Sequence, residues 1–520
     1  MMKNRIGVLA GLVAATALLA PVFAAEPAFT FPESNLSVKG RVTLLAIDDQ
    51  GLRDRENLTL TLSKPKVRKE PVLTPEQGNP NAPDSMAAHF YGTVLHDNGK
   101  FRMWYYAVSK EKGQEQDLKQ GPVCYAESDD GIRWTKPKLG QVEINGSKEN
   151  NAIFLPDPLT QIAMVLLDED DPNPGHRYKM LYTTRQKTWV FRPAYSADGI
   201  QWNVPDGYPT DKFMESGSLF KFGGRYIVHG QGIGMNGRGE VEGRQGYAST
   251  SHDFMTWDIP YHEAFRLAEA EDLSKRGLLG DYPQVHLGIG AASFGNVVVG
   301  LYGRWHNPPE GQGRKEGWYG SGLITCDLAL VVSNDGIRFR EPEPGHVYIS
   351  QLESPATQAE GASDPTILCQ ANGILNVGDE TLIYHGRWRN ATDTAKNYYG
   401  EIGLATLPRD RWGSLSVAEG SESGTVWSAP ITLPAEAFDI SLNADGAKNI
   451  TVEIADESGA LLPEFSGENS GEVKGAKSMT SPVKWKGDGL AALVGKTVKL
   501  KLGLEGEKAG LYAVYLDPVK

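Results

Sequence analysis

Ser128-Asp129-Asp130-Gly131-Ile132-Arg133-Trp134 is the first copy of a phrase that recurs along the chain. The phrase returns at residues 196–202 (SADGIQW) and 333–339 (SNDGIRF), and in weaker form at 251–257 (SHDFMTW) and 406–412 (TLPRDRW). Its aspartate can accept hydrogen bonds from the backbone N–H groups of an Asx turn, and its glycine takes a positive φ without strain. We interpret the phrase as a structural turn between strands, and five copies predict five similar units.

Apolar, β-branched and aromatic residues precede every copy of the phrase. These segments, typical of strands, lie at 101–106, 177–182, 225–229, 297–302 and 381–385. The phrase aspartates stand at positions 130, 198, 253, 335 and 410, and each interval between them is long enough for a four-stranded sheet with its loops. Radial repetition of five such sheets predicts a five-bladed β-propeller over residues 25–423, with the channel mouth as the default site.

The pattern of apolar and polar residues changes after the last copy of the phrase. From about Gly424 the chain alternates apolar and polar residues without the phrase, which predicts a C-terminal β-sandwich over residues 424–520. The whole chain of 520 residues contains 59 glycines and 31 prolines, and this composition favours short strands and tight turns over helices. The predicted fold class is therefore all-β.

The segment at positions 1–24 has the order of features typical of a secretory signal peptide. Lys3 and Arg5 precede an apolar run at 6–20, and Ala24 ends the segment. We expect cleavage after Ala24 and a secreted or periplasmic protein. Cleavage leaves 50 basic and 65 acidic residues, a formal net charge of −15, which disfavours nucleic acid and anionic lipid as partners. No later stretch approaches about 20 consecutive apolar residues, so we expect no membrane span.

Three widely spaced cysteines, Cys124, Cys326 and Cys369, fit neither a disulfide scaffold nor a zinc site. We expect buried free thiols, with a single disulfide bridge as the alternative. No metal-ligand spacing is visible, and no cofactor is expected; a structural calcium ion in the axial channel is kept as an alternative. The sequence sets no oligomeric state.

The five units, the Ser-x-Asp-Gly-Ile-x-Trp turns and the trailing sandwich resemble the propeller glycoside hydrolases of the invertase/levanase and arabinanase/xylosidase type. The segments 90–95, 102–105, 145–151 and 177–182 look most like a bacterial group of family-32-like hydrolases. The resemblance implies three acidic residues at the start of the innermost strands of the first three blades, acting as nucleophile or base, transition-state stabiliser and general acid. The family motifs Trp-Met-Asn-Asp-Pro-Asn-Gly, Arg-Asp-Pro and Glu-Cys are missing here, so position alone guides the assignment.

Glycoside hydrolysis commonly needs two carboxyl groups beside the scissile bond, one protonated and one ionised. Asp84, Asp157 and Glu215 each precede the expected first strand of the first three units. We assign them as base or nucleophile, stabiliser and general acid respectively. Asp281 before the fourth unit and Asp364 before the fifth are the reserves for these roles.

Sugar sites combine aromatic platforms with planar hydrogen-bonding groups, because sugar rings present apolar C–H faces surrounded by hydroxyls. Trp305 and Trp388 end equivalent strands of the fourth and fifth units, although packing between blades is an equally good explanation of both. The remaining candidates for substrate binding are Asp48, His89, His286, Arg304, Glu360, His385 and Arg387.

These features predict a secreted glycoside hydrolase that cleaves a plant or algal oligosaccharide or polysaccharide at the channel mouth by carboxylate chemistry. Two alternatives stay open. A non-catalytic glycan-binding propeller would have the aromatic platforms without a facing carboxyl pair. A glycoside phosphorylase would use one carboxylic acid and a phosphate site of arginine and histidine.

Overall fold

The computed structural model describes residues 28–519 except for 111–117, 158, 186–188, 208–213, 236–240, 260, 268–281, 308–322, 391–397, 487–488 and 507. The predicted signal peptide at 1–24 and the candidate Asp281 lie outside the described residues. The described part is all-β and contains no α-helix; its helical turns are short 3₁₀ segments at Pro174–His176, Pro463–Phe465, Gly467–Asn469 and Gly489–Leu493. None of its helical segments has the length and apolar character needed to cross a membrane.

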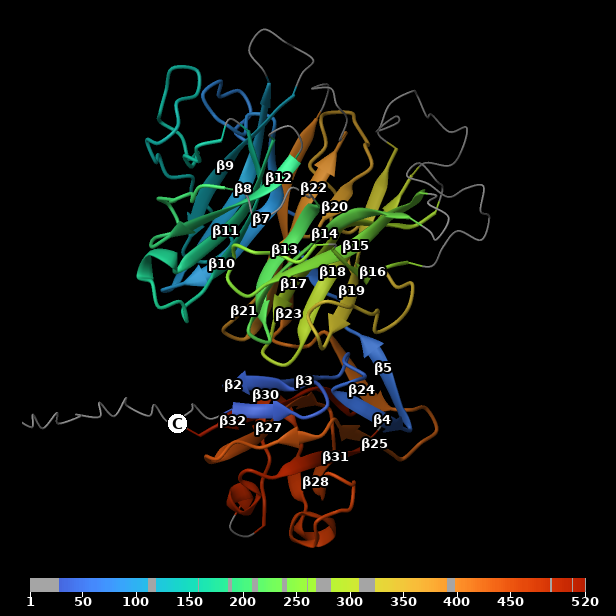
Figure 1. The fold of residues 1–520 in the computed structure, drawn as a ribbon. Helices are drawn as coiled ribbons and strands as arrows, with labels where there is room; N and C mark the ends of the chain where they lie inside the picture. The colour runs from blue at the N-terminus through green and yellow to red at the C-terminus, as the bar shows by residue number, and fades with distance from the viewer. Residues whose placement is uncertain are drawn as a thin grey trace, which may run out of the picture.

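The larger part of the described chain contains five antiparallel groups of strands (Figure 1). Two of the groups are separate sheets, and the other three are joined by parallel pairings into one eleven-stranded sheet. The groups are β7 (Ala87–Asp97), β8 (Lys100–Lys110) and β9 (Leu118–Ser128); β10 (Thr160–Leu167), β11 (Tyr178–Arg185) and β12 (Trp189–Ser196); β13 (Glu215–Phe222), β14 (Arg225–Met235), β15 (Val241–Ser251) and β16 (His262–Phe265); β17 (Gln284–Ser293), β18 (Val298–His306) and β19 (Thr325–Ser333); and β20 (Ile367–Cys369), β21 (Ile374–Val377), β22 (Glu380–Arg389), β23 (Tyr399–Pro408) and β6 (Lys66–Val67). The five segments predicted to be strands fall in β8, β11, β14, β18 and β22, which confirms them.

The first strands of four groups and β21 of the fifth are neighbours in a closed cycle. β7 contacts β10, β10 contacts β13, β13 contacts β17, β17 contacts β21, and β21 contacts β7. The last group also joins the first through a parallel pairing of β23 with β7 at Gly400 and Ala87. The groups therefore surround a common axis.

The recurring phrase forms the expected turn in four of its five copies. The first copy follows β9: Asp130 Oδ1 accepts bonds from the backbone N–H of Ile132 (2.9 Å) and Arg133 (2.8 Å), and Ser128 Oγ donates to the same oxygen (3.1 Å). Asp198, Asp253 and Asp335 accept the equivalent pairs of backbone bonds. The structural reading of the phrase is confirmed for these copies.

Neighbouring groups are joined through the same turns. The carbonyl oxygen of a phrase glycine accepts a bond from the middle strand of the preceding group: Trp104 Nε1 donates to Gly199 (2.8 Å), and Tyr384 of the last group donates to Gly131 of the first (2.7 Å). The latter contact closes the cycle. In the fifth copy, Asp410 instead accepts bonds from Asn376 Nδ2 (2.6 Å) and the Tyr515 hydroxyl (2.8 Å).

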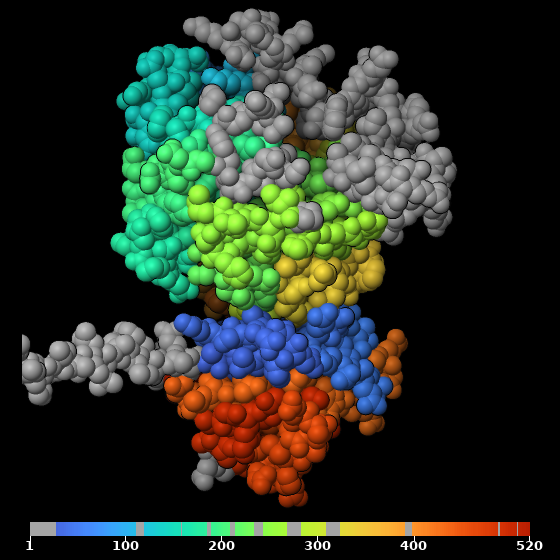
Figure 2. All heavy atoms as spheres, viewed as in Figure 1, coloured from blue at the N-terminus to red at the C-terminus, as the bar shows by residue number. Residues whose placement is uncertain are grey.

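The smaller part consists of two sheets built from both ends of the chain. One sheet contains β1 (Ala28–Phe31), β2 (Leu36–Lys39), β4 (Leu52–Glu56), β25 (Ser423–Ser428), β26 (Ile431–Thr432), β28 (Asn449–Asp456), β29 (Gly471–Lys474) and β31 (Thr497–Glu505). The other contains β3 (Val42–Leu45), β5 (Leu58–Leu62), β24 (Gly413–Val417), β27 (Phe438–Asp445), β30 (Lys477–Pro482) and β32 (Gly510–Pro518). Figure 2 shows the blue N-terminal residues layered on the orange and red C-terminal ones.

This composition corrects the predicted division at 25–423 and 424–520. The N-terminal strands pair with C-terminal ones, as β3 does with β32 over Val42 to Leu45, and β24 belongs to the same sheet. The physical reason is that β32 needs a partner along both edges, which the C-terminal segment alone does not supply. The recurring phrase occurs only within residues 128–412, so it could not predict that strands from the two ends of the chain pair with each other.

Asp48 lies where the two parts meet. Its carboxylate accepts bonds from Arg340 NH2 (2.6 Å) and Asn334 Nδ2 (2.8 Å), both in or next to the fourth copy of the phrase, and the residue is fully buried. Asp48 was expected to bind substrate; the structure corrects this, because the carboxylate joins the two-sheet part to the fourth group. The three cysteines are buried and free, as expected.

Candidate functional site

The first strands of the groups are irregular near the end at which they begin. The strand register shifts between Gln161 and Ala163 in β10, between Ser216 and Ser218 in β13, and after His286 in β17. At Gly217 an added Cβ would lie 2.4 Å from the Leu287 carbonyl oxygen, so β13 and β17 approach closely because that residue has no side chain. Such bulges turn the preceding side chains away from the regular pleat.

Glu215 begins β13 and is the acidic residue at the centre of this end. Its carboxylate accepts a bond from Gln231 Nε2 of β14 (3.2 Å) and one from the Tyr91 hydroxyl of β7. Burial raises the pKa of Glu215, and the nearby charge of Arg244 and the bond from Tyr91 oppose that rise only in part. The side chain is half-buried, so a raised pKa coincides with access from solvent. This combination is what a general acid needs.

Aromatic and histidine side chains from other groups surround Tyr91. His286 Nε2 of β17 lies 3.4 Å from the Tyr91 hydroxyl, and the Trp388 ring of β22 lies 4.8 Å from the Tyr91 ring. His89 packs edge-on against Trp388 at 4.2 Å, and His286 packs against Trp305 at 4.7 Å between ring centroids. The structure thus brings together five predicted residues from four groups: Glu215, His89, His286, Trp305 and Trp388.

Both histidines are neutral hydrogen-bonding groups. Burial lowers the pKa of His89 to about 3, and burial with the charge of Arg244 lowers the pKa of His286 well below its usual value. His89 Nε2 lies 2.5 Å from the Tyr398 hydroxyl, whereas His89 Nδ1 and Trp388 Nε1 are buried without a partner among the described residues. Buried polar atoms without a hydrogen-bond partner are rare in folded proteins, and a bound ligand would supply such a partner.

Arg244 of β15 belongs to the cluster and was missed by the sequence analysis. Its guanidinium lies over the Trp305 ring, 4.6 Å from the centroid, and its charge acts on both Glu215 and His286. The segment 241–246 (VEGRQG) contains two glycines and carries no motif. Only the pairing of β15 with β14 and its contact with β17 bring Arg244 to Glu215.

Asp84 lies outside the contacts of this cluster. It is fully buried, and its Oδ2 accepts bonds from Lys136 Nζ (2.6 Å) and the Tyr105 hydroxyl (2.9 Å), while Oδ1 has no partner among the described residues. Burial raises the pKa of Asp84 despite the charge of Lys136. A carboxylate without access to solvent is poorly placed to attack a substrate or activate water.

Asp157 is one of the residues that line a separate cavity of about 560 Å³ between β9 and β10, and its side chain is 4% exposed. Its carboxylate accepts bonds from Arg192 NH1 (2.8 and 3.0 Å) and the Tyr182 hydroxyl (2.5 Å). Because β10 and β13 are neighbours, Asp157 and Glu215 stand at the beginnings of adjacent first strands. Of Asp84 and Asp157, Asp157 is therefore the one that lines a cavity.

The acids before β20 lie apart from Glu215. Asp364 accepts a bond from Asn390 Nδ2 (2.8 Å) and lies 3.8 Å from Arg389 NH1, and Glu360 is exposed in the preceding loop. Among the described residues, no contact joins Glu360 to the cluster around Tyr91, and its expected role in substrate binding stays a prediction.

Three further predicted binding residues are structural. On β22, Arg387 donates through Nε to Ser354 Oγ (2.8 Å) and through NH1 to the Lys69 carbonyl (2.7 Å), and His385 Nε2 lies 2.7 Å from the same Ser354 hydroxyl. Successive strand side chains point to opposite faces, so these two point away from the face of Trp388. Arg304 likewise points to the opposite face of its strand from Trp305, and it donates to the Gly345 carbonyl (2.5 Å). The predictions for Arg387, His385 and Arg304 are corrected accordingly.

The axis below the cluster is occupied by side chains. Asn372, between β20 and β21, donates through Nδ2 to the carbonyl oxygens of Val165 (3.1 Å) and Leu219 (2.9 Å) and accepts from the Leu219 N–H (3.2 Å). Gln370 Nε2 donates to the Gly288 carbonyl (2.8 Å). Side chains therefore fill the axis at the level of Asn372 and Gln370.

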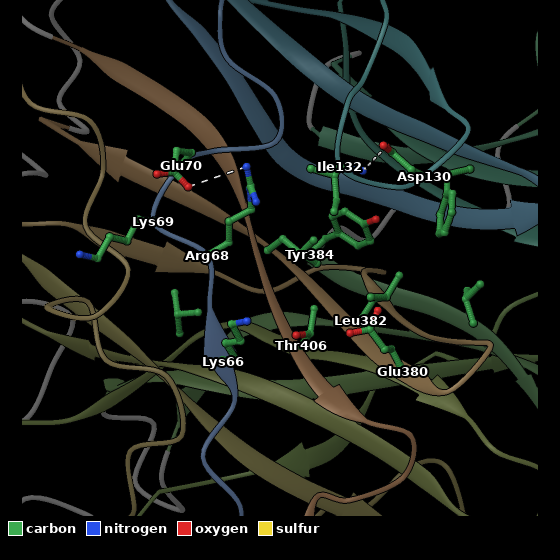
Figure 3. A pocket seen from close by; sticks show the side chains of 14 residues that line it. Lys66, Arg68, Lys69, Glu70, Asp130, Ile132, Glu380, Leu382, Tyr384 and Thr406 are labelled. Carbon is green, nitrogen blue, oxygen red and sulfur yellow. Dashed lines mark hydrogen bonds and ion pairs between the residues drawn. The ribbon is translucent and has the colours of Figure 1, made fainter.

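A second cavity, of about 530 Å³, lies between β6, β22 and the turn after β9 (Figure 3). Lys66, Arg68 and Glu70 stand along the segment at one side, and Tyr384 and Leu382 project from β22. None of the predicted site residues lines it. Among the residues described, there is also no group of three or more His, Cys, Asp or Glu side chains that could hold a metal ion.

No family model matches the chain. Two proteins of Mycobacterium tuberculosis, uncharacterized protein MT1551 of strain CDC 1551 / Oshkosh and uncharacterized protein Rv1502 of strain ATCC 25618 / H37Rv, are each 26% identical to it over 161 residues. The match covers 29% of this chain and 48% of each relative, so the chain spans about half the length of the curated relatives it matches.

Several solved structures share a distant overall similarity with the chain. A glycosyl hydrolase from Bacteroides ovatus is 17% identical and covers 68% of this chain and 94% of its own, with a TM-score of 0.40. A structure from the GH130 family of mannoside phosphorylases is 15% identical, covering 67% and 95% with a TM-score of 0.40. A family 43 arabinoxylan arabinofuranohydrolase from Bacillus subtilis is 10% identical, covering 84% and 96% with a TM-score of 0.36. Similarities at this level do not by themselves indicate function.

Proposed function

We propose that the protein cleaves glycosidic bonds of an oligosaccharide or polysaccharide, with Glu215 as the general acid. The observation that supports this most directly is the placement of a half-buried carboxyl group of raised pKa among Trp305, Trp388 and neutral histidines. Trp305 and Trp388 are buried and pack against the histidines. The polar side chains beside Glu215 suit the hydroxyls of a sugar. A protonated carboxyl among them is suited to protonate a leaving oxygen.

The fold belongs to the same proposal. We propose that the five strand groups are the blades of a five-bladed β-propeller and that the two sheets built from both ends of the chain form a β-sandwich. The closed cycle of strand contacts and the bond from Tyr384 to Gly131 support the propeller. In this arrangement the site lies at the mouth of a channel that Asn372 closes further along the axis.

In the proposed reaction the bond between the anomeric carbon and the leaving oxygen breaks. Glu215 transfers its proton to that oxygen, which departs as an alcohol, and the oxygen of a water molecule adds to the anomeric carbon. The water's proton passes to an ionised carboxylate, which then returns Glu215 to its acid form through solvent. Asp157 is the carboxylate that we assign to this second role, because Asp84 is completely buried.

The positive charge of Arg244 near Glu215 supports phosphorolysis as the second candidate reaction. Arg244 lies within electrostatic reach of Glu215 and His286, and an arginine guanidinium binds phosphate well. In that reaction phosphate replaces water at the anomeric carbon, the product is a glycosyl phosphate, and a single carboxylic acid is sufficient.

The test is release of reducing sugar from plant and algal oligosaccharides and aryl glycosides, with and without inorganic phosphate. We expect turnover by the wild type and a loss of about 10²-fold or more in Glu215→Gln, because a general acid contributes about 10²- to 10⁴-fold. Glu457→Gln, an exposed glutamate of the two-sheet part, is the matched control and is expected to keep full activity. A folded Glu215→Gln variant with wild-type turnover would refute the role of Glu215. A requirement for phosphate would select phosphorolysis.

We propose a secreted or periplasmic location on the basis of the sequence of residues 1–24. The test is expression of the full chain with a tagged C-terminus in a bacterial host, followed by N-terminal sequencing of the extracellular or periplasmic fraction. A mature protein that begins at Ala25 is expected, and retention of an uncleaved chain in the cytoplasm would contradict the proposal.

A further inference from the structure

The cavity beside Asp157 has the volume of a ligand site. It measures about 560 Å³ and lies between the beginnings of β9 and β10, and ligand pockets commonly measure about 300–1,000 Å³. The residues that matter for its chemistry are Gln120, Phe154, Asp157, Gln161 and Trp189. No role has been assigned to four of these.

Two amide side chains give the cavity an open donor and an open acceptor. Gln161 Nε2 donates to Gln120 Oε1 at 2.5 Å, which orients both amides. Gln161 is 7% exposed, and its side-chain Oε1 has no hydrogen-bond partner among the described residues. The side-chain amino group of Gln120, an exposed residue, has no such partner either. A hydroxyl group both donates and accepts, so a pair of this kind is suited to a sugar hydroxyl.

Two aromatic rings supply the apolar part of the cavity. Phe154 is 58% exposed, which is unusual for so large an apolar side chain, and Trp189 of β12 lines the same space. An exposed aromatic ring at the edge of a polar cavity suits a ligand with one apolar face and a hydroxylated edge.

The charges that line the cavity are balanced. Asp157 is ion-paired with Arg192 at 2.8 Å, and the remaining charged lining residues, Lys119 and Glu143, have opposite signs. A cavity without net charge is poorly suited to a uronate, a sulfated sugar or free phosphate. The chemistry points to an uncharged, hydroxylated ligand.

We propose that this cavity is a binding subsite for one or more neutral sugar residues of the substrate. This proposal rests on the proposed function in one respect: the sugar residues bound in the cavity belong to the same oligosaccharide whose glycosidic bond meets Glu215. Because β10 and β13 are adjacent, the cavity beside Asp157 lies next to the strand that Glu215 begins. The protein therefore prefers longer neutral oligosaccharides to short ones.

The test uses the full chain carrying Glu215→Gln, so that binding is measured without cleavage. Titration calorimetry is run with the neutral probes β-1,4-mannopentaose and α-1,5-arabinopentaose and with trigalacturonic acid as the charged probe. We expect at least one neutral pentasaccharide to bind, and Phe154→Ala to weaken that binding about fivefold. Phe154→Tyr keeps the aromatic face and should bind like the parent. Leu352→Ala, which removes another exposed apolar side chain (78% exposed) outside the cavity, should also bind like the parent.

The outcomes separate the subsite from the proposed activity. Equal binding by the parent and Phe154→Ala, binding of trigalacturonic acid alone, or binding of none of the probes would each overturn the subsite. If a pentasaccharide binds in a Phe154-dependent way but wild-type protein cleaves no glycoside, the proposed function fails and the subsite stands. If the wild type cleaves glycosides, Phe154→Ala should raise KM for the pentasaccharide and leave that for the aryl glycoside unchanged.

Discussion

Asn372→Ala should destabilise the protein more than the same substitution of an asparagine in an exposed loop. Asn372 comes from the fifth group, yet its side chain makes three hydrogen bonds to the backbone of β10 and β13, at Val165 and Leu219. Val165 and Leu219 are themselves almost completely buried. Alanine would leave two carbonyl oxygens and one N–H of these strands without their partner.

The size of the effect follows from these three bonds. A hydrogen bond contributes about 0.5–1.5 kcal/mol net, and a buried backbone group left unpaired costs about 1–3 kcal/mol. We expect a loss of about 3 kcal/mol in the free energy of unfolding, because Asn372 itself is half-buried and water can replace part of what is lost. The measurement is urea unfolding followed by tryptophan fluorescence at neutral pH, with an unchanged dependence on urea concentration.

The control is Asn469→Ala. Asn469 makes one exposed bond, to the Pro463 carbonyl (3.0 Å), so its loss should cost less than about 1 kcal/mol. Equal and small losses in the two variants would refute the reasoning that a polar side chain on the axis holds the strand groups together.

Three further predictions concern charge. Bonds from Arg177 and the Tyr178 hydroxyl hold the pKa of Asp97 at about 2, below its usual value near 3.9, although burial raises it; Asp97→Asn should therefore cost about 2 kcal/mol above pH 4, with the difference vanishing as the pH falls toward 2 in urea unfolding curves. Because the pKa of Glu215 is raised, kcat/KM should fall as the pH rises through that pKa; Arg244→Met removes a charge that lowers it and should move this alkaline limb to higher pH. Arg387→Met should lower stability by about 3–5 kcal/mol in the same unfolding assay, because Glu401 stays buried without its cation 3.8 Å away.

The local elements of the fold could be predicted from the sequence because their bonds join near neighbours. In the phrase, the bonds of Asp130 run to residues two and three positions away, so a short stretch contains all the partners that shape the turn. The strands before each phrase also carry their apolar pattern within a few residues. The prediction of Glu215 rested on an equally local pattern, an acid at the start of the first strand of its group.

The surroundings of Glu215 depend on contacts between residues far apart in the chain. Arg244 of the third group meets Trp305 of the fourth, and Tyr91 of the first group meets Glu215 of the third. Since no local pattern encodes such contacts, Arg244 was missed. The N-terminal strands were misassigned for the same reason: β3 and β32 pair with each other although they lie near opposite ends of the chain.

The sequence by itself determined the repeated turns, the all-β class and the position of Glu215, because each of these depends on a few consecutive residues. Only the tertiary structure decided which side of each strand faces the site. Arg387 and Trp388 are adjacent in the chain, yet Trp388 packs on His89 while Arg387 binds Ser354 on the opposite face. The physical reason is that strand side chains alternate, so pairing and register, which are set by distant partners, decide which neighbour enters the site.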